Sequence, residues 1–124
     1  MKYNYNSSGP ELSMLADKCK TNPAFLHPQD LEELGLEDGD LVTVSSHHGV
    51  IPAVARAAQD IRPGVVSMAH CWGAAPEPET DDKVRDIGSN TNRLISTRDN
   101  PEKYSGIPRQ STVPVTVTPL GATA

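Results

Sequence analysis

The chain is poor in aromatic residues and has no long apolar run. Aromatic side chains make up 4% of its 124 residues, as one Trp, one Phe and three Tyr. No segment approaches the roughly 18 apolar residues of a membrane-spanning helix, and none resembles the apolar region of a signal peptide. We therefore expect a single cytoplasmic domain, without membrane insertion, around a small aliphatic core.

Basic residues and cysteines are also scarce. The 11 Lys and Arg residues are outnumbered by 16 Asp and Glu residues, which gives a formal net charge of −5. Nucleic-acid-binding domains normally carry a basic face, so this balance argues against a nucleic-acid partner. The two cysteines, Cys19 and Cys71, are far apart and form no CxxC pair. We expect two reduced thiols rather than a disulfide or a shared metal ion.

Glycine and proline, by contrast, are abundant, with nine and 11 residues. They predict many turns and long irregular stretches. Residues 74–92 and 96–110 contain few apolar side chains, and we expect two long surface loops there. Loops of this length are usually functional or disordered.

The hydrophobic periodicity predicts a mainly β chain with short helices. Apolar residues at helical spacing follow Pro10, and a second short helix starts at Pro28 and ends before Gly35. Beyond residue 37 the period becomes two, which predicts strands over 41–45, 50–57, 65–69 and 111–119. Pro52 lacks a ladder donor, so we expect it at a sheet edge or a bulge.

Two stretches are candidates for ligand binding because of where they lie. A helix starting at Pro10 would leave free N–H groups beside the Ser7 and Ser8 hydroxyls, which suits an anion. The alternative is an ordinary helix cap. The sequence HCWG follows the expected strand over 65–69, where a ring could stack on Trp72 while His70 donates a hydrogen bond. The alternative is that Trp72 fills the aromatic-poor core.

Two further stretches carry polar side chains at regular spacing. Asn90 and Asn92 would face the same way in extended chain, and each amide offers the donor and acceptor that read a heterocycle's edge. Arg93 beside them could meet a phosphate. The alternative is that both asparagines form local turns. Arg109 and Gln110 precede the last expected strand, and their alternative role is solvation.

Catalytic and metal-binding patterns are missing. His47 and His48, like His70 and Cys71, are adjacent in the chain, so in extended backbone they point to opposite faces and do not share an ion easily. The sequence has no Ser-His-Asp order, phosphate-binding loop or paired-carboxylate motif. We predict neither a metal site nor a catalytic residue in this chain.

Three segments, taken in order, resemble a known family. They are NPAFLHPQDLEELGLEDGDLVTVSS, IRPGVVSMAHCWG and SNTNRLISTRDNPEKYSGIPRQSTVPVTV. Together they resemble the C-terminal molybdopterin-dinucleotide-binding domain of the dimethyl sulfoxide reductase and formate dehydrogenase superfamily of molybdenum and tungsten oxidoreductases. The resemblance implies a six-stranded double-psi β-barrel over 21–119, a linker that leads into the domain over 1–20, and a disordered tail over 120–124.

The resemblance also implies a ligand and its contacts. The cofactor would be molybdopterin guanine dinucleotide, in its bis form, with molybdenum or tungsten held by other domains. The metal-ligating residue of the superfamily lies outside this stretch, so this chain alone is not expected to be catalytic. Its partners would be the remaining domains or subunits, and a twin-arginine signal on a longer parent would make the location periplasmic. The cofactor-binding positions would be Asn6, Ser7, His70, Trp72, Gly73, Asn92, Arg109 and Gln110.

An alternative from another class is a double-psi barrel that binds a substrate or a protein without a cofactor. Such a module would use the face formed by EDGD and SSHHGV. A third use of this barrel, a self-processed decarboxylase, would need cleavage between a Gly and a Ser, and Gly88-Ser89 is such a pair.

Overall fold

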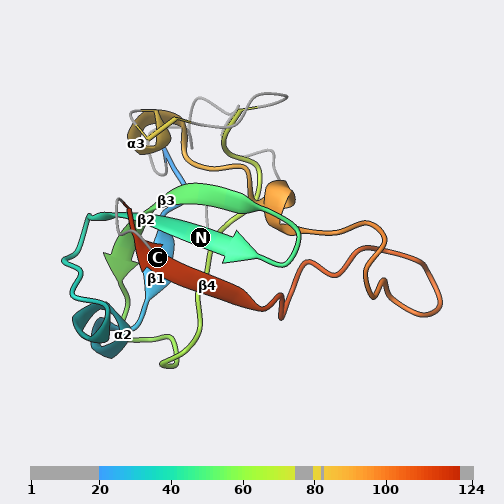
Figure 1. Cartoon of the computed structure of the whole chain (residues 1–124), viewed down its shortest axis with the longest axis horizontal. Helices are drawn as coiled ribbons and strands as arrows, with labels where there is room; N and C mark the ends of the chain where they lie inside the picture. Colours follow the sequence, from blue (N-terminus) through green and yellow to red (C-terminus); the bar gives the residue numbers. More distant parts are fainter. Residues whose placement is uncertain (1–19, 75–79, 82, 121–124) are drawn as a thin grey trace.

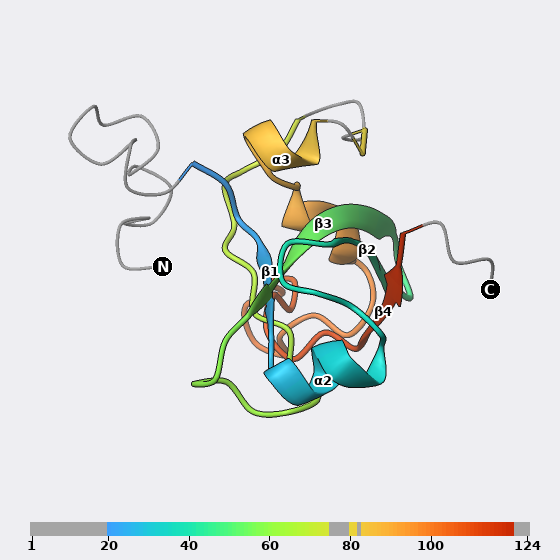
Figure 2. The same cartoon turned by 90° about the vertical axis from the view of Figure 1, so that its left-hand side faces the viewer.

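The computed structural model describes residues 20–74, 80–81 and 83–120. This part of the chain contains one four-stranded sheet that curls like half of a barrel (Figures 1 and 2). The sheet order is β1-β3-β2-β4, and the strands are β1 (Ala24–Leu26), β2 (Leu41–Ser46), β3 (Val50–Ala57) and β4 (Val115–Pro119). The strand β2 pairs antiparallel with both β3 and β4, and β1 pairs parallel with β3.

Three short helices surround this sheet in the described residues. They are α2 (Pro28–Glu33), α3 (Val84–Ile87) and the 3₁₀ helix η2 (Thr91–Leu94). None of them is long and apolar enough to cross a membrane. The expected helix after Pro10 lies outside the described residues.

The core is aliphatic, as the composition predicts. Alternation in β2 buries Val42 and Val44, and alternation in β3 buries Ile51, Ala53 and Ala55 on the facing positions. The other members of the buried cluster are Ala24, Leu26, Leu31, Leu36 and Leu94. Trp72 does not belong to this cluster, so the expectation that it might be the main core filler is wrong.

The helix predicted at Pro28 is confirmed, and its start is capped by a histidine. The His27 Nδ1 atom accepts a hydrogen bond from the Gln29 N–H at 3.1 Å, which satisfies one of the free donors of the first turn. Gly35 follows the helix with φ of 67°, the left-handed conformation that glycine adopts at a helix end without strain.

Two predicted strands differ from the structure. Residues 65–69 form only an isolated bridge, in which Ser67 and Phe25 exchange backbone hydrogen bonds of 2.9 and 3.0 Å. Their partner β1 is three residues long because Pro23 and Pro28 bracket it. The last strand begins at Val115 rather than residue 111, since Thr112 has φ of 57° and Pro114 cannot donate to a ladder.

Pro52 lies in β3, inside the sheet, but at a point where β3 has a neighbouring strand on one side only. Pro52 faces Thr43 of β2, whereas β1 pairs only with residues 55–57 of β3. The Pro52 carbonyl instead accepts a hydrogen bond from the Ser89 hydroxyl. The side of β3 that faces away from β2 is therefore open to the 88–94 loop.

The mainly β class with short helices is confirmed, whereas the described residues form four strands of a curled sheet rather than six of a closed barrel. Residues 65–69 contribute only their bridge to β1, and residues 111–114 precede the last strand. Beyond β4, the Leu120 N–H still donates to the Leu41 carbonyl at 3.1 Å.

An ion pair at the far end of β3 makes stability depend on pH. The Asp38 carboxylate accepts from the Ala57 N–H at 2.7 Å and from Arg56 Nη1 at 3.0 Å. These contacts, the Ala57 hydrogen bond first, lower the pKa of Asp38 below its ordinary value of 3.8. A carboxyl with a lowered folded-state pKa stabilises the fold above its unfolded pKa, and this contribution is lost as the pH falls through the folded value.

We therefore expect Asp38→Asn to lower the urea midpoint at pH 7. The gap between the variant and the original chain should narrow as the pH falls below 3.8 and close below the lowered folded-state pKa of Asp38, where the carboxyl is neutral in the folded and the unfolded chain. Urea unfolding at pH 7 and pH 3 measures this difference. Asp60→Asn, at an exposed acid without such contacts in the described residues, controls for the loss of one negative charge, and an equal gap at both pH values would contradict the prediction.

Candidate functional site

Three loops meet beside the sheet, and the buried side chain of Asn22 joins them. Asn22 is 2% exposed. Its Nδ2 group donates to the Ala69 carbonyl at 2.6 Å and to the Ser89 carbonyl at 2.8 Å, while its Oδ1 accepts from the Ser89 N–H at 2.8 Å. The segment 20–22 thus fixes the loops 69–74 and 88–94, which carry four of the predicted site residues.

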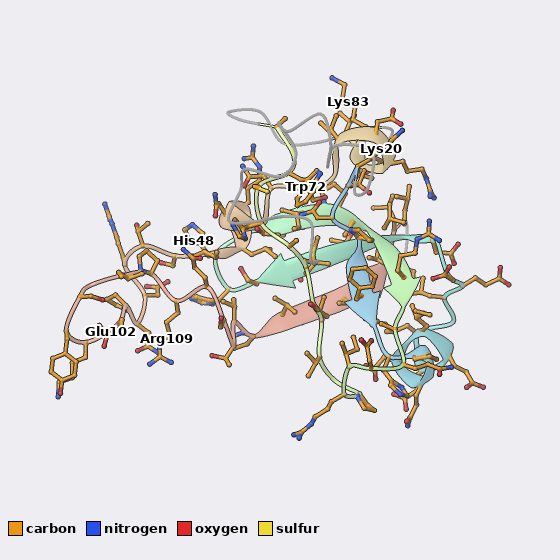
Figure 3. The ribbon with its side chains drawn as sticks, turned by 180° about the vertical axis from the view of Figure 1, so that it is seen from behind. Lys20, His48, Trp72, Lys83, Glu102 and Arg109 are labelled. Atoms are coloured by element: carbon orange, nitrogen blue, oxygen red, sulfur yellow. The ribbon has the colours of Figure 1, made fainter. Side chains whose placement is uncertain are left out.

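Trp72 lies against the segment that precedes β1. Its indole N–H donates to the Lys20 carbonyl at 3.0 Å (Figure 3), and its side chain is half-buried. On the other side, the Trp72 Cβ lies close to Gly88, where an added Cβ would approach it to 2.9 Å. The ring is therefore held in a fixed orientation while part of its surface remains open to a ligand.

The neighbours of Trp72 lie on an unusual stretch of backbone. Cys71 has φ of 77°, a conformation that is rare and costly for a residue with a side chain. His70 on one side and Gly73 on the other are exposed. The Gly73 N–H donates to the Ile87 carbonyl at 2.9 Å. This loop is held at both ends, as expected for a loop that presents side chains.

The two asparagines have different roles. Residues 91–94 form the 3₁₀ helix η2 rather than extended chain, and Asn90 caps it by accepting from the Asn92 N–H at 3.1 Å. Asn90 also donates to the Ala74 carbonyl at 3.3 Å. The expectation that both amides face one way is wrong. Asn92 is exposed and its side chain makes no hydrogen bond within the described residues.

Arg93 supports the loop next to it. Its Nη2 atom donates to the Ala74 carbonyl at 3.2 Å, and the side chain is half-buried. This contact ties η2 to the end of the 70–74 loop. Arg93 thereby contributes to the position of Trp72 and Asn92, and at least one of its donors is already used.

The turn between β2 and β3 packs directly on η2. The Ser46 hydroxyl donates to the Leu94 carbonyl at 2.8 Å and accepts from the N–H groups of His48 and Gly49, each at 3.1 Å. Gly49 lies so close to the Arg93 carbonyl that a Cβ would collide with it. The 70–74 loop, η2 and this turn therefore form a continuous row of contacting elements.

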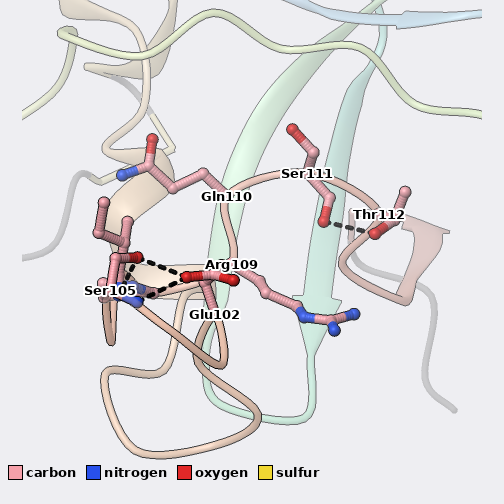
Figure 4. A pocket seen from close by; sticks show the side chains of 8 residues that line it. Glu102, Ser105, Arg109, Gln110, Ser111 and Thr112 are labelled. Carbon is pink, nitrogen blue, oxygen red and sulfur yellow. Dashed lines mark hydrogen bonds between the residues drawn. The ribbon is translucent and has the colours of Figure 1, made fainter.

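Arg109 and Gln110 lie on an arm, residues 96–114, that extends away from the sheet (Figures 1 and 3). Arg109 lines two depressions, one of about 410 Å³ on the arm itself and one of about 650 Å³ between the arm and the β2–β3 turn. Gln110 lines only the first. Figure 4 shows the Arg109 side chain directed away from Glu102 and Ser105.

One of the two acids on this arm, Glu102, forms its hydrogen bonds within the arm. The Glu102 Oε2 atom accepts from the Ser105 hydroxyl and N–H, each at 2.7 Å, and from the Tyr104 N–H at 3.0 Å. These hydrogen bonds, Ser105 first, hold the pKa of Glu102 below its ordinary value. Within the described residues the one ion pair joins Asp38 and Arg56, so the Arg109 charge has no carboxylate partner there.

The structure thus places His70, Trp72 and Gly73 on one loop and Asn92 on a second loop that contacts the first. Arg109 and Gln110 lie at the far end of the row, and Figure 3 shows His48 between Trp72 and Arg109. Asn6 and Ser7 fall outside the described residues. The sequence analysis missed Asn22, because a single asparagine before Pro23 carries no signal beyond that of a turn.

The described residues contain no group of three or more His, Cys, Asp and Glu side chains able to hold a metal ion. What the row offers is an indole face, a free amide and a guanidinium. Such groups suit a planar heterocycle and a phosphate rather than a metal ion.

Comparisons with known proteins identify the family of the chain. A family model described as the molydopterin dinucleotide binding domain matches residues 1–114. Over 43 residues the chain is 49% identical to the alpha subunit of the F420-dependent formate dehydrogenase of Methanocaldococcus jannaschii, which corresponds to 35% of this chain and 6% of that protein.

Acetylene hydratase from Pelobacter acetylenicus shares the fold. The two structures match with a TM-score of 0.69 at 23% identity, over 91% of this chain and 16% of that chain. The chain therefore spans a small part of the length of both relatives. Since the family model covers most of the sequence, this chain belongs to the molybdopterin dinucleotide-binding domain family of the molybdopterin oxidoreductases, and the resemblance read from its sequence is confirmed.

Proposed function

We propose that this chain holds molybdopterin guanine dinucleotide, in its bis form, through the row of elements formed by the 70–74 loop, η2 and the arm. It would do so as the C-terminal domain, or as a small subunit, of a molybdenum or tungsten oxidoreductase of the formate dehydrogenase type. The domain would extend over 21–119, and its partners would be the remaining domains or subunits. The cofactor, when bound, supplies the redox chemistry.

The observation that carries this proposal is that three unused groups lie on adjoining, well-held elements. Trp72 offers a ring face fixed by its bond to Lys20. Asn92 offers an amide that makes no hydrogen bond within the described residues. Arg109 offers a guanidinium without an ion-pair partner there. Stacking, edge recognition and phosphate pairing are the three contacts that a pterin dinucleotide requires.

The charge distribution along β2 favours the same end of the molecule. Residues 28–40, at the start of β2, contain no Lys or Arg but six acids: Asp30, Glu32, Glu33, Glu37, Asp38 and Asp40. At the opposite end of β2 lie the turn with His47 and His48 and the row that leads to Arg109. An anionic dinucleotide is therefore favoured there, despite the net charge of −5.

The curled sheet would be part of a six-stranded double-psi barrel. The bridge between Phe25 and Ser67 is where a further strand would extend the ladder beyond β1. We assign the site residues binding and orientation only. The reacting metal would be held by residues outside this chain.

The chain's single tryptophan makes the proposal testable by fluorescence. Molybdopterin guanine dinucleotide released from a molybdoenzyme, added without oxygen to the chain, should change the Trp72 emission. Asn92→Ala should weaken this binding about fivefold to tenfold, because about 1 to 1.5 kcal/mol is typical for lost amide hydrogen bonds. Gln59→Ala, which removes an exposed amide after the far end of β3, is the matched control.

The proposal would be rejected if the emission does not respond to the cofactor. It would also be rejected if Gln59→Ala and Asn92→Ala weaken binding equally, because the amide in η2 would then have no special part. The alternative, a binding module without a cofactor, predicts the first of these outcomes.

A further inference from the structure

The outer end of the arm, residues 101–108, presents apolar side chains to solvent, and we call it the tip. Tyr104 is 89% exposed and Ile107 is 58% exposed. The Tyr104 hydroxyl has no hydrogen-bond partner within the described residues. Figure 3 shows Glu102, which belongs to the same turn, at the outer end of the arm. Two large apolar side chains thus stand together on a projecting turn, in a chain with few aromatic residues.

The tip has a defined shape because its own hydrogen bonds close it. The Glu102 N–H donates to the Ile107 carbonyl at 2.8 Å, and the Gly106 N–H donates to the Glu102 carbonyl at 2.9 Å. The Glu102 carboxylate accepts from the N–H groups of Tyr104 and Ser105 at 3.0 and 2.7 Å. None of these bonds uses the side chain of Tyr104 or Ile107. The two apolar side chains are therefore held out to solvent without contributing to the structure of the tip.

An ordered turn with an exposed tyrosine has the properties of a docking element. Single exposed apolar side chains are common on protein surfaces, but adjacent ones mark interaction sites more often. A tyrosine buries about 150 to 250 Å² when it enters an interface, and tyrosines are enriched among the residues that dominate binding. Because the tip is already ordered, docking costs little conformational entropy.

The charge of the tip is cationic on its outer side. Its acid, Glu102, is occupied by hydrogen bonds within the tip. Lys103 is exposed and forms no ion pair within the described residues, and its Nζ atom lies 5.7 Å from the centroid of the Tyr104 ring. A surface that complements the tip therefore has an apolar socket for the ring and an acid at the rim.

The occupant of this surface is argued from size and from the chain's own depressions. The part of the chain that matches covers 6% of the formate dehydrogenase alpha subunit and 16% of the acetylene hydratase chain. Most of each relative thus lies outside the matched part. A second copy of this chain is a poor partner, because the two depressions that Arg109 lines are bordered mainly by hydroxyl, amide and charged side chains.

We propose that the tip docks into an apolar socket on another domain or subunit of the oxidoreductase, with Tyr104 and Ile107 buried and Lys103 beside an acid at the rim. The proposal rests on the proposed function in one respect, namely that this chain is part of a larger oxidoreductase, and it names the surface that joins the two. Arg109 and Gln110 lie on the same arm, so docking also fixes their position relative to the rest of the enzyme.

Photochemical crosslinking identifies what covers the tip. The photoreactive residue p-benzoylphenylalanine, which is aromatic and apolar, takes the place of Tyr104 in the assembled oxidoreductase. After irradiation, mass spectrometry should find the tip joined to peptides of the oxidoreductase that lie outside this chain. Crosslinks to a second copy of this chain, or no crosslink to the rest of the oxidoreductase, would overturn the proposal.

Hydrogen exchange measures how strongly the tip is docked. Exchange of the tip amides should be at least about tenfold slower in the assembled oxidoreductase than in the 124-residue chain by itself. Ile107→Ser and Lys103→Glu should each reverse this slowing at least about fivefold, as expected for interface residues that contribute about 1 kcal/mol. The matched controls are Val65→Ser, an exposed valine in the turn next to α2, and Lys83→Glu at the start of α3, and both should leave the exchange of the tip unchanged.

The outcomes separate the proposal from the proposed function. Equal exchange of the tip in the assembled and the separate chain would overturn the docking, as would equal effects of Ile107→Ser and Val65→Ser. A Trp72 response to the cofactor would still leave the proposed function standing. Circular dichroism of each variant should match that of the original chain, because the hydrogen bonds of the tip do not involve the substituted side chains.

Discussion

Replacing Asn22 by alanine should lower the free energy of unfolding by about 3 to 5 kcal/mol, because the change leaves several buried polar groups without a partner. The lost contacts are three hydrogen bonds of 2.6, 2.8 and 2.8 Å to Ala69 and Ser89. Ser89 is itself 1% exposed, so water cannot readily replace Asn22. Urea unfolding followed by circular dichroism measures the difference.

Two further variants make the Asn22 result specific. Asn22→Asp keeps the oxygen that accepts from the Ser89 N–H but loses both donors, so it should also be strongly destabilising. Gln59→Ala removes an exposed amide outside the three loops and should change the stability by less than about 0.5 kcal/mol. A loss of under about 1 kcal/mol in Asn22→Ala would show that the three loops do not depend on this side chain.

Gly88→Ala should have an effect of similar size for a different reason. Gly88 has φ of 73° and ψ of −162°, a region that is almost restricted to glycine. A Cβ there would collide with Asn22 Oδ1 and approach the Trp72 Cβ to 2.9 Å. We expect a loss of about 3 kcal/mol or more, because backbone strain of about 1 to 3 kcal/mol adds to the steric conflict.

The chain offers a matched control for Gly88→Ala. Gly106 has a similar φ of 71°, but a Cβ there would meet nothing within 4 Å. Gly106→Ala should therefore cost only the backbone strain, about 1 kcal/mol. The Trp72 emission should shift in the Gly88 variant and not in the Gly106 variant. Equal losses in both would mean that contact with Asn22 and Trp72 contributes nothing.

Elements that are determined by a local sequence pattern could be predicted, whereas elements that depend on a long-range contact could not. The alternation in β2 and β3 and the proline and glycine around α2 are local, and these elements occur where the sequence predicts them. The stretch 65–69 is as apolar as a strand, but its pairing depends on β1, which is three residues long. The strand propensity of a segment does not indicate how long the neighbouring strand is with which it must pair.

The site was predictable in part for the same reason. His70, Trp72, Gly73 and Asn92 were expected from residue type and resemblance, and the structure places them on two loops in contact. Their mutual position depends on Asn22, which hydrogen-bonds to residues 47 and 67 positions away in the sequence. Neither hydrophobic periodicity nor a sequence motif indicates a hydrogen bond between residues so far apart. The sequence analysis considered His47 and His48 only as possible metal ligands, because no sequence pattern shows that the arm lies beside their turn and lines a depression with them.

The hydrogen bonds made by Lys20 and Asn22 make the position of Trp72 depend on the position of the segment 20–22. Residues 20–22 are covalently joined to the segment that precedes them. They also hold the 69–74 and 88–94 loops through hydrogen bonds of 2.6 to 3.0 Å. A pull that moved this segment by about 1 Å would take these bonds beyond hydrogen-bonding distance. Such a displacement of residues 20–22 would therefore release the Trp72 ring from its anchor without any change in the sheet.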